Sequence, residues 1–106
     1  MPTITVNRKV IEKIIGKKLS EHELKEKISM LGTDLEHITS DEIVVEIFPN
    51  RPDMLSEQGF GRALASFIGT KTGLREYSVK PPTGKNEKCI VSHGMEKVRP
   101  YTVCCI

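Results

Sequence analysis

The feature that most constrains the fold is a run of β-branched and apolar residues that ends at two closely spaced prolines. Residues 42–48, EIVVEIF, favour an extended strand whose side chains alternate between two faces. Val44 and Phe48 make the second face apolar as well, so we expect this strand to be covered on most of both faces. Neither Pro49 nor Pro52 can donate to a strand ladder, so the strand must end there. Other elements therefore have to pack around it.

Two helices and a short strand are predicted before this run. Residues 3–6 alternate polar and apolar side chains, as a strand does. Asn7 is a good N-cap for a helix that ends at Gly16. Ser20 and Glu23 stand at the two positions of a capping box, which begins a second helix. The apolar residues at helical spacing that we expect on the buried faces are Val10, Ile11, Ile14, Ile15, Leu24, Ile28 and Leu31.

A third helix and several short strands complete the expected elements. Leu35 and Ile38 predict a strand that forms a hairpin with residues 42–48. Small residues in the third helix leave room for close packing, and its apolar stripe consists of Phe60, Leu64, Phe67 and Ile68. Further short strands are expected at residues 77–79, 89–91 and 101–106. The fold class is therefore α+β, with three helices and a small antiparallel sheet.

The length fits one domain, or one domain and the start of another. The chain has 106 residues. Residues 81–88 contain prolines and glycine but no large apolar residue, which is typical of a linker. We therefore expect a first module at residues 1–80 and the truncated start of a second domain at residues 89–106.

Charge is unevenly distributed, although the net charge is only +2. Residues 1–30 carry seven basic and four acidic side chains, and residues 31–60 carry one basic and seven acidic. A solvated surface explains this pattern, and a phosphate-binding flank is the alternative. No apolar run approaches the ~18 residues of a membrane span, and neither a secretory signal nor a disulfide framework is present. We expect a cytoplasmic protein without a membrane partner.

The sequence contains no common catalytic motif, such as a phosphate loop, GxGxxG, HExxH or GxSxG. The histidines fall in three different elements, at His22, His37 and His93. The cysteines lack the spacing of metal ligands, and we expect buried apolar side chains at Cys89, Cys104 and Cys105. We therefore predict no catalytic, cofactor-binding or metal-binding residue in this chain.

Asn50, Arg51, Pro52 and Asp53 form a corner between the long strand and the third helix. Pro52 favours an extended conformation at Arg51, and either Asp53 or Ser56 can cap the helix. The corner is either a simple connection between strand and helix, or it projects the Arg51 side chain so that it binds a phosphate or a partner carboxylate.

Of these interpretations, we predict that Arg51 is an internal, structural arginine. Acidic residues are frequent between Asp34 and Glu46, so the guanidinium is expected to pair bidentately with one of them. Such a pair would fix the sheet to the third helix. Removing the side chain should then lower the free energy of unfolding by more than about 1.5 kcal/mol.

Around this corner the sequence resembles the signature of the phenylalanyl-tRNA synthetase β subunit. The resemblance is carried by EIVVEIFPNRPDMLSEQGFGRALASFIGTKTG, residues 42–73. The residues that fit the family pattern are Asn50, Arg51, Pro52, Asp53, Ser56, Gly59, Arg62, Ala63 and Leu64, with Met54 where leucine is usual. The opening MPTITVNRKVIEKIIGKKLSEHELKEKISMLGTDLE is similar to the archaeal and eukaryotic branch of the family.

The resemblance implies that residues 1–80 form the N-terminal, B1-type domain of that subunit, with a winged-helix-like layout of different connectivity. Residues 89–106 would begin the editing-type B3/B4 domain. It also implies an enzyme of two α and two β subunits that attaches phenylalanine to tRNA. ATP and Mg²⁺ would be bound outside this chain.

Two functions stay open for the first module: a structural and assembly role, or binding of tRNA or DNA. A recognition helix displays clustered basic and amide side chains. The third helix is expected to offer only Gln58, Arg62 and Lys71. The lysines of the first two helices are accompanied by glutamates. The assembly role is therefore favoured, and the chain alone is expected to be catalytically inactive.

Overall fold

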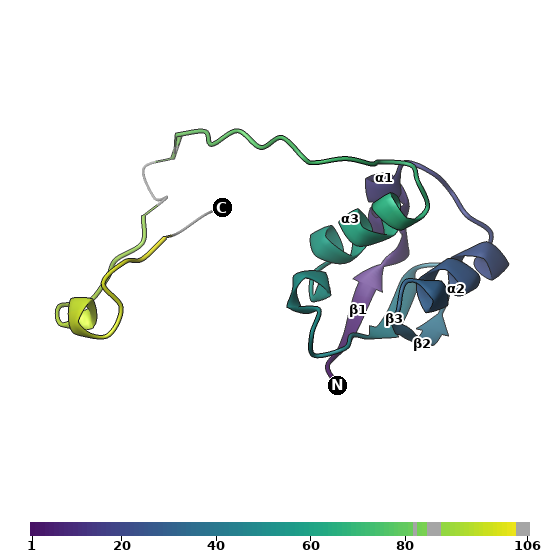
Figure 1. Cartoon of the computed structure of the whole chain (residues 1–106), viewed down its shortest axis with the longest axis horizontal. Helices are drawn as coiled ribbons and strands as arrows, with labels where there is room; N and C mark the ends of the chain where they lie inside the picture. The colour runs from purple at the N-terminus through teal and green to yellow at the C-terminus, as the bar shows by residue number, and fades with distance from the viewer. Residues whose placement is uncertain (82, 85–87, 104–106) are drawn as a thin grey trace. The chain divides into compact units, whose positions relative to one another are not determined.

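The computed structural model describes residues 1–81, 83–84 and 88–103. The chain divides into two units, Met1–Arg75 and Glu76–Ile106. The first unit contains a strand and two helices, then a hairpin, a short 3₁₀ turn and a third helix (Figure 1). In chain order these are β1 (Thr3–Asn7), α1 (Arg8–Ile15), α2 (Glu21–Met30), β2 (Asp34–Ile38), β3 (Glu42–Glu46), η1 (Pro52–Met54) and α3 (Glu57–Phe67). The expected α+β fold is confirmed.

The three strands form one antiparallel sheet in the order β1-β3-β2, so β3 is central. Ile4 of β1 and Leu35 of β2 both lie opposite Val45, and a register shift follows Leu35 in β2. One sheet face and the three helices share a single buried cluster. It contains Val6, Ile11, Ile15, Leu24, Ile28, Ile38, Ile43, Val45, Phe60 and Leu64, among others.

The second face of the sheet is polar, so the expectation of cover on both faces of the central strand is wrong. Val44 is half-buried, and Phe48 beyond the end of β3 is 38% exposed. Thr5 and His37, the partners of Val44 on the neighbouring strands, are exposed. Each helix buries one apolar face, and all three faces join the same cluster. A few apolar side chains on a polar surface are ordinary, so two such residues did not require a second layer.

The helix ends follow the sequence signals. Asn7 Oδ1 accepts from the backbone N–H groups of Lys9 and Val10 at 2.9 and 3.2 Å. Gly16 ends α1 in the left-handed conformation, at φ 71°. Both bonds of the capping box are present: Glu23 N donates to Ser20 Oγ at 3.2 Å, and Ser20 N donates to Glu23 Oε2 at 3.0 Å. The first two helices are therefore fixed locally at their ends.

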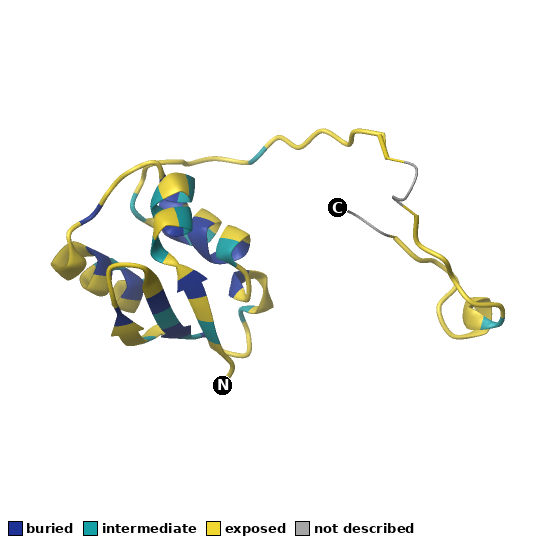
Figure 2. Ribbon diagram, turned by 180° about the vertical axis from the view of Figure 1, so that it is seen from behind, coloured by how far each residue is buried: buried dark blue, intermediate teal, exposed yellow. Residues whose placement is uncertain are grey.

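The second unit contains, in its described part, one short 3₁₀ turn, η2 (Met95–Lys97). The strands expected at residues 77–79, 89–91 and 101–103 are absent, and their side chains are exposed (Figure 2). A strand needs a paired neighbour and an apolar face to pack on, and these segments have neither. Cys89 is exposed rather than buried. Cys104, Cys105 and the rest of the last expected strand lie outside the described residues.

None of the described helices combines the length and the hydropathy that a membrane span requires.

Candidate functional site

The Pro-Asn-Arg-Pro-Asp corner connects β3 to α3 through η1. Asn50 lies in an exposed turn, and the N–H of Arg51 donates to the carbonyl of Phe48 at 3.0 Å. Pro52 opens η1, and Met54 at its end is fully buried. Of the two helix caps that the sequence left open, the structure uses Ser56, whose Oγ accepts from Gly59 N at 3.1 Å.

Two glycines of α3 allow this corner and α1 to approach the helix closely. A Cβ atom at Gly59 would overlap the carbonyl oxygen of Asp53, so the corner's backbone lies directly on the first turn of α3. A Cβ atom at Gly61 would lie 2.8 Å from Cγ2 of Ile14 in α1. The expectation of close packing at the small residues is confirmed, and it explains two glycines inside a helix.

Arg51 does not hold the sheet to the helix, and the predicted partner was wrong. Its Nε and Nη2 donate to Oδ1 and Oδ2 of Asp53 at 3.3 and 3.4 Å. The two side chains are 40% and 46% exposed. The backbone of Arg51 has φ −125° and ψ 57°, which is not the extended conformation expected before proline. The chain turns at once into η1, so the nearest carboxylate lies two residues further on and not in the acidic stretch.

This contact is a surface pair. The hydrogen bond from Arg51 holds the pKa of the Asp53 carboxyl below its usual value. Exposed pairs of this kind contribute about 0–1 kcal/mol to stability. Arg62, the other arginine of the sequence motif, lies exposed on α3.

The structural arginine of the module is Arg8, which the sequence analysis did not single out. Its Nε donates to Glu12 Oε1 at 3.1 Å, Nη1 to the carbonyl of Thr39 at 3.0 Å and Nη2 to the carbonyl of Leu19 at 3.3 Å. The side chains of Arg8 and Glu12 are only 16% and 14% exposed. Arg8 therefore joins α1, the segment before α2 and the β2–β3 turn. The i, i+4 spacing of Arg8 and Glu12 was the visible signal.

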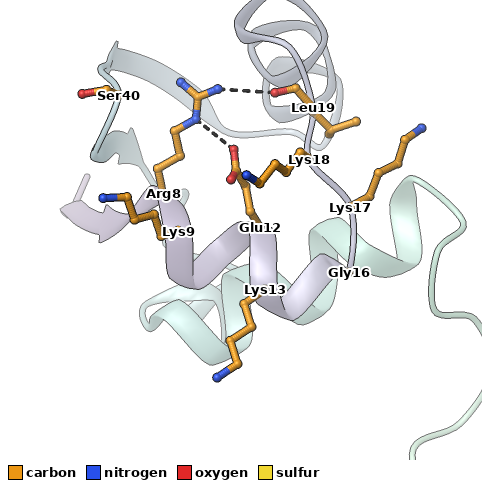
Figure 3. Close-up of a pocket in the computed structure, with 9 residues that line it drawn as sticks. All are labelled: Arg8, Lys9, Glu12, Lys13, Gly16, Lys17, Lys18, Leu19 and Ser40. Carbon is orange, nitrogen blue, oxygen red and sulfur yellow. Dashed lines mark hydrogen bonds and ion pairs between the residues drawn. The ribbon is translucent and has the colours of Figure 1, made fainter.

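A pocket of about 770 Å³ opens beside this arginine, and we call it the basic pocket (Figure 3). The residues that line it are Arg8, Lys9, Glu12, Lys13, Gly16, Lys17, Lys18, Leu19 and Ser40. Five of these carry a positive charge, and Glu12 is the one acid among them. Lys9 also pairs with Asp41 at 3.2 Å, and this contact holds the pKa of Asp41 below its usual value. The lining therefore favours anions.

Carboxylates gather at another place in the first unit. Ligand atoms of Asp34, Glu36 and Glu46 lie within 4.8 Å of one another. Glu46 also lies 3.5 Å from the N-terminal amine. Exposed acidic groups of this kind are common without an ion, and no histidine or cysteine accompanies them. His22, His37 and His93 are each exposed in separate elements.

Comparison with known proteins agrees with this fold. Residues 1–70 match the domain family described as the Phe-tRNA synthetase beta subunit B1 domain. A crystal structure of an N-terminal fragment of the phenylalanyl-tRNA synthetase beta-subunit from Pyrococcus horikoshii has a TM-score of 0.67. That likeness covers 77% of this chain and 25% of the other at 24% identity, and it shows a shared fold.

Two beta subunits from other organisms also match the chain beyond residue 70. The phenylalanine–tRNA ligase beta subunit of Methanosarcina acetivorans is 33% identical over 106 residues, which is 100% of this chain and 18% of that protein. The subunit of Methanopyrus kandleri is 45% identical over 83 residues, or 76% of this chain and 14% of that protein. The chain thus spans less than a fifth of the length of these relatives. From its domain match and these relatives, the chain belongs to the family of phenylalanyl-tRNA synthetase β subunits.

Proposed function

We propose that residues 1–75 serve as a structural and assembly module of a phenylalanine–tRNA ligase. In this proposal the β subunit joins an α subunit, in a complex of two α and two β chains, that attaches phenylalanine to its tRNA in the cytoplasm. The observation that carries the proposal is the match of residues 1–70 to a domain of the β subunit. Family membership supports the ligase activity, and the geometry of the module supports an assembly role within the ligase.

The contacts within the module support this role, because they position backbone and do not present reactive groups. Its best-defined contacts are caps, close glycine packing and the Arg8 junction, all of which position backbone. The corner also presents apolar side chains, since Phe48 and Leu55 on either side of it are both partly exposed. Exposed apolar groups beside a rigid turn suit contact with another subunit or domain.

ATP and Mg²⁺, which such a ligase would use, do not fit the residues described here. The acidic cluster of Asp34, Glu36 and Glu46 is open to solvent, and the basic pocket has no carboxylate free to hold a metal ion. A Mg²⁺–ATP site needs carboxylates and phosphate-binding groups together. We therefore propose that both bind outside this chain.

Two measurements test this proposal. The chain without α subunit should show no phenylalanine-dependent ATP–pyrophosphate exchange. In the complete ligase, a β subunit lacking residues 1–75 should give less α–β complex, measured by sedimentation. Exchange by the isolated chain, or a complex of unchanged mass and stability after the deletion, would contradict the assigned role.

Nucleic-acid binding is the second candidate function, and one observation favours it. The basic pocket gathers five cations on α1 and the segment after it, including lysines that the sequence analysis set against the neighbouring glutamates. We develop this observation next.

A further inference from the structure

The lysines of the first unit divide into those with a partner and those without. Three have one: Lys9 with Asp41 at 3.2 Å, Lys25 with Glu21 at 2.8 Å, and Lys71 with the carbonyl of Ile14 at 2.6 Å. The side chains of Lys13, Lys17, Lys18 and Lys27 make no hydrogen bond or ion pair to the described residues, although the charge of Lys17 adds to the lowering of the Glu23 pKa that the Ser20 hydrogen bonds cause. Three of these four line the basic pocket, so the unneutralised charge of the unit is concentrated there.

The acid of the pocket does not offset these lysines, because Glu12 is already bound to Arg8 at 3.1 Å. The same arginine donates to the carbonyl of Leu19, and so anchors the segment that carries Lys17 and Lys18. At its other end the segment begins at Gly16, whose backbone N–H donates to the carbonyl of Glu12 and ends α1. Its backbone is therefore held before any ligand arrives, which lowers the entropic cost of binding.

The lysines of the pocket extend in different directions, as Figure 3 shows for Lys9, Lys13 and Lys17. A single compact phosphate would be bound by side chains that converge on one point. Charges spread around an open hollow instead suit an extended chain of anions. The separation of the lysines therefore favours a polyanion.

The lining also distinguishes between two kinds of polyanion. A protein partner is usually anchored by large apolar or aromatic side chains at the centre of the interface. Leu19 is the one large apolar residue that lines the basic pocket, and it is buried. Binding to a nucleic-acid backbone requires no such anchor, because release of counterions from the phosphates drives it. The pocket has no aromatic side chain on which a base could stack, so the contact would be to the phosphates, which carry no sequence information.

We propose that the basic pocket binds the phosphate backbone of tRNA through Lys13, Lys17 and Lys18. The proposal rests on the proposed function only for the identity of the RNA. Each lysine contributes an ammonium group to a phosphate as a point charge. The carboxylates of the exposed sheet face, at Asp34 and Glu46, repel the same backbone and limit the contact to the side of α1.

The experiment measures the affinity of the 106-residue chain for an unmodified tRNA transcript, by fluorescence anisotropy over a range of salt concentrations. The test variant is Lys17→Gln with Lys18→Gln. The matched control is Lys25→Gln with Lys27→Gln on α2, which removes the same charge away from the pocket. Denaturation midpoints of both variants confirm that each is folded.

The test variant should reduce the slope of log affinity against log salt by about 1.4, since each phosphate contact contributes roughly 0.7. If the test variant and the unchanged chain bind tRNA equally at 1 M salt, this difference in slope means that the variant binds about 25-fold more weakly at 0.1 M salt. The control should change the slope by less than a quarter of that. Lys13→Gln alone should give about half the effect of the test variant.

Equal losses in the test and control variants would overturn the proposal, because they would indicate general charge attraction. The proposal would also be overturned if polyglutamate binding depended on Lys17 and Lys18 but tRNA binding did not, because the pocket would then bind an acidic protein. The assembly role is measured separately, by α–β complex formation with the test variant in the complete ligase. A complex that forms normally but has lost the salt-dependent tRNA contact supports the pocket without altering the assembly role.

Discussion

Replacing Arg8 or Arg51 by alanine should have unequal effects on stability, although both arginines pair with a carboxylate. Arg8→Ala removes three hydrogen bonds and leaves the largely buried carboxylate of Glu12 without its partner. Deleting one member of a fully buried pair costs about 3–5 kcal/mol, and one hydrogen bond to a charged group contributes about 1.5–3 kcal/mol. Since the pair keeps some contact with water, we expect a loss of about 3 kcal/mol.

Arg51→Ala should cost less than about 1 kcal/mol, because its pair with Asp53 is close to half exposed. This value replaces the larger loss that the sequence alone predicted. The difference between the two variants, about 2 kcal/mol, would shift the urea midpoint by roughly 1 M if unfolding has a slope near 2 kcal/mol per molar.

The assay is urea unfolding followed by far-UV circular dichroism, with the slope checked in each variant. Arg8→Lys is the informative control, since a lysine keeps the charge but cannot reach three acceptors in different directions. It should recover only part of the loss. Midpoints for Arg8→Ala and Arg51→Ala that agree within error would refute the assignment of Arg8 as the structural junction.

Three other predictions concern the caps and the corner. Ser20→Ala should lower the free energy of unfolding by about 1 kcal/mol in the same assay, through loss of the α2 cap. The hydrogen bonds from Ser20 hold the pKa of Glu23 below its usual value. As pH falls, this carboxyl is protonated in the unfolded chain before it is protonated in the folded one, so the free energy of unfolding should decrease below about pH 5. The Glu23→Gln variant should lose less of its free energy of unfolding between about pH 6 and pH 3. Gly59→Ala should destabilise by about 1–3 kcal/mol through overlap with Asp53, despite the better helix propensity of alanine, whereas the exposed Gln58→Ala should be nearly neutral.

The elements that the sequence predicted correctly depend on neighbours along the chain. A capping box joins residues three apart, and a glycine ends a helix by its own backbone freedom. Ser20, Glu23 and Gly16 could therefore be assigned without tertiary structure. The same holds for the apolar spacing that placed Ile11 and Leu24 in the core.

The errors arose where the partner is distant or is part of the backbone. Two of the three acceptors of Arg8 are the carbonyls of Leu19 and Thr39, and every residue type carries a carbonyl. No pattern of side chains could reveal that contact. For Arg51 the abundance of acids between residues 34 and 46 suggested a partner there, but the closeness of Asp53 decided the pairing. The lysines of the basic pocket were visible as a charge excess, and only the bend after Gly16 gathers them around one hollow.

The order of the strands has a consequence for how the module can form during synthesis. The first strand pairs with the third, so Ile4 meets Val45 only after roughly 40 further residues have been made. Closing a loop of that length costs about 3 kcal/mol of chain entropy before any contact in the sheet offsets it. α1 also packs against α3, at Gly61, and so it waits for a still later segment. A nascent chain ending before β3 therefore holds its N-terminal strand without a partner, and one ending before α3 still holds α1 without the helix it packs against, so the module closes late.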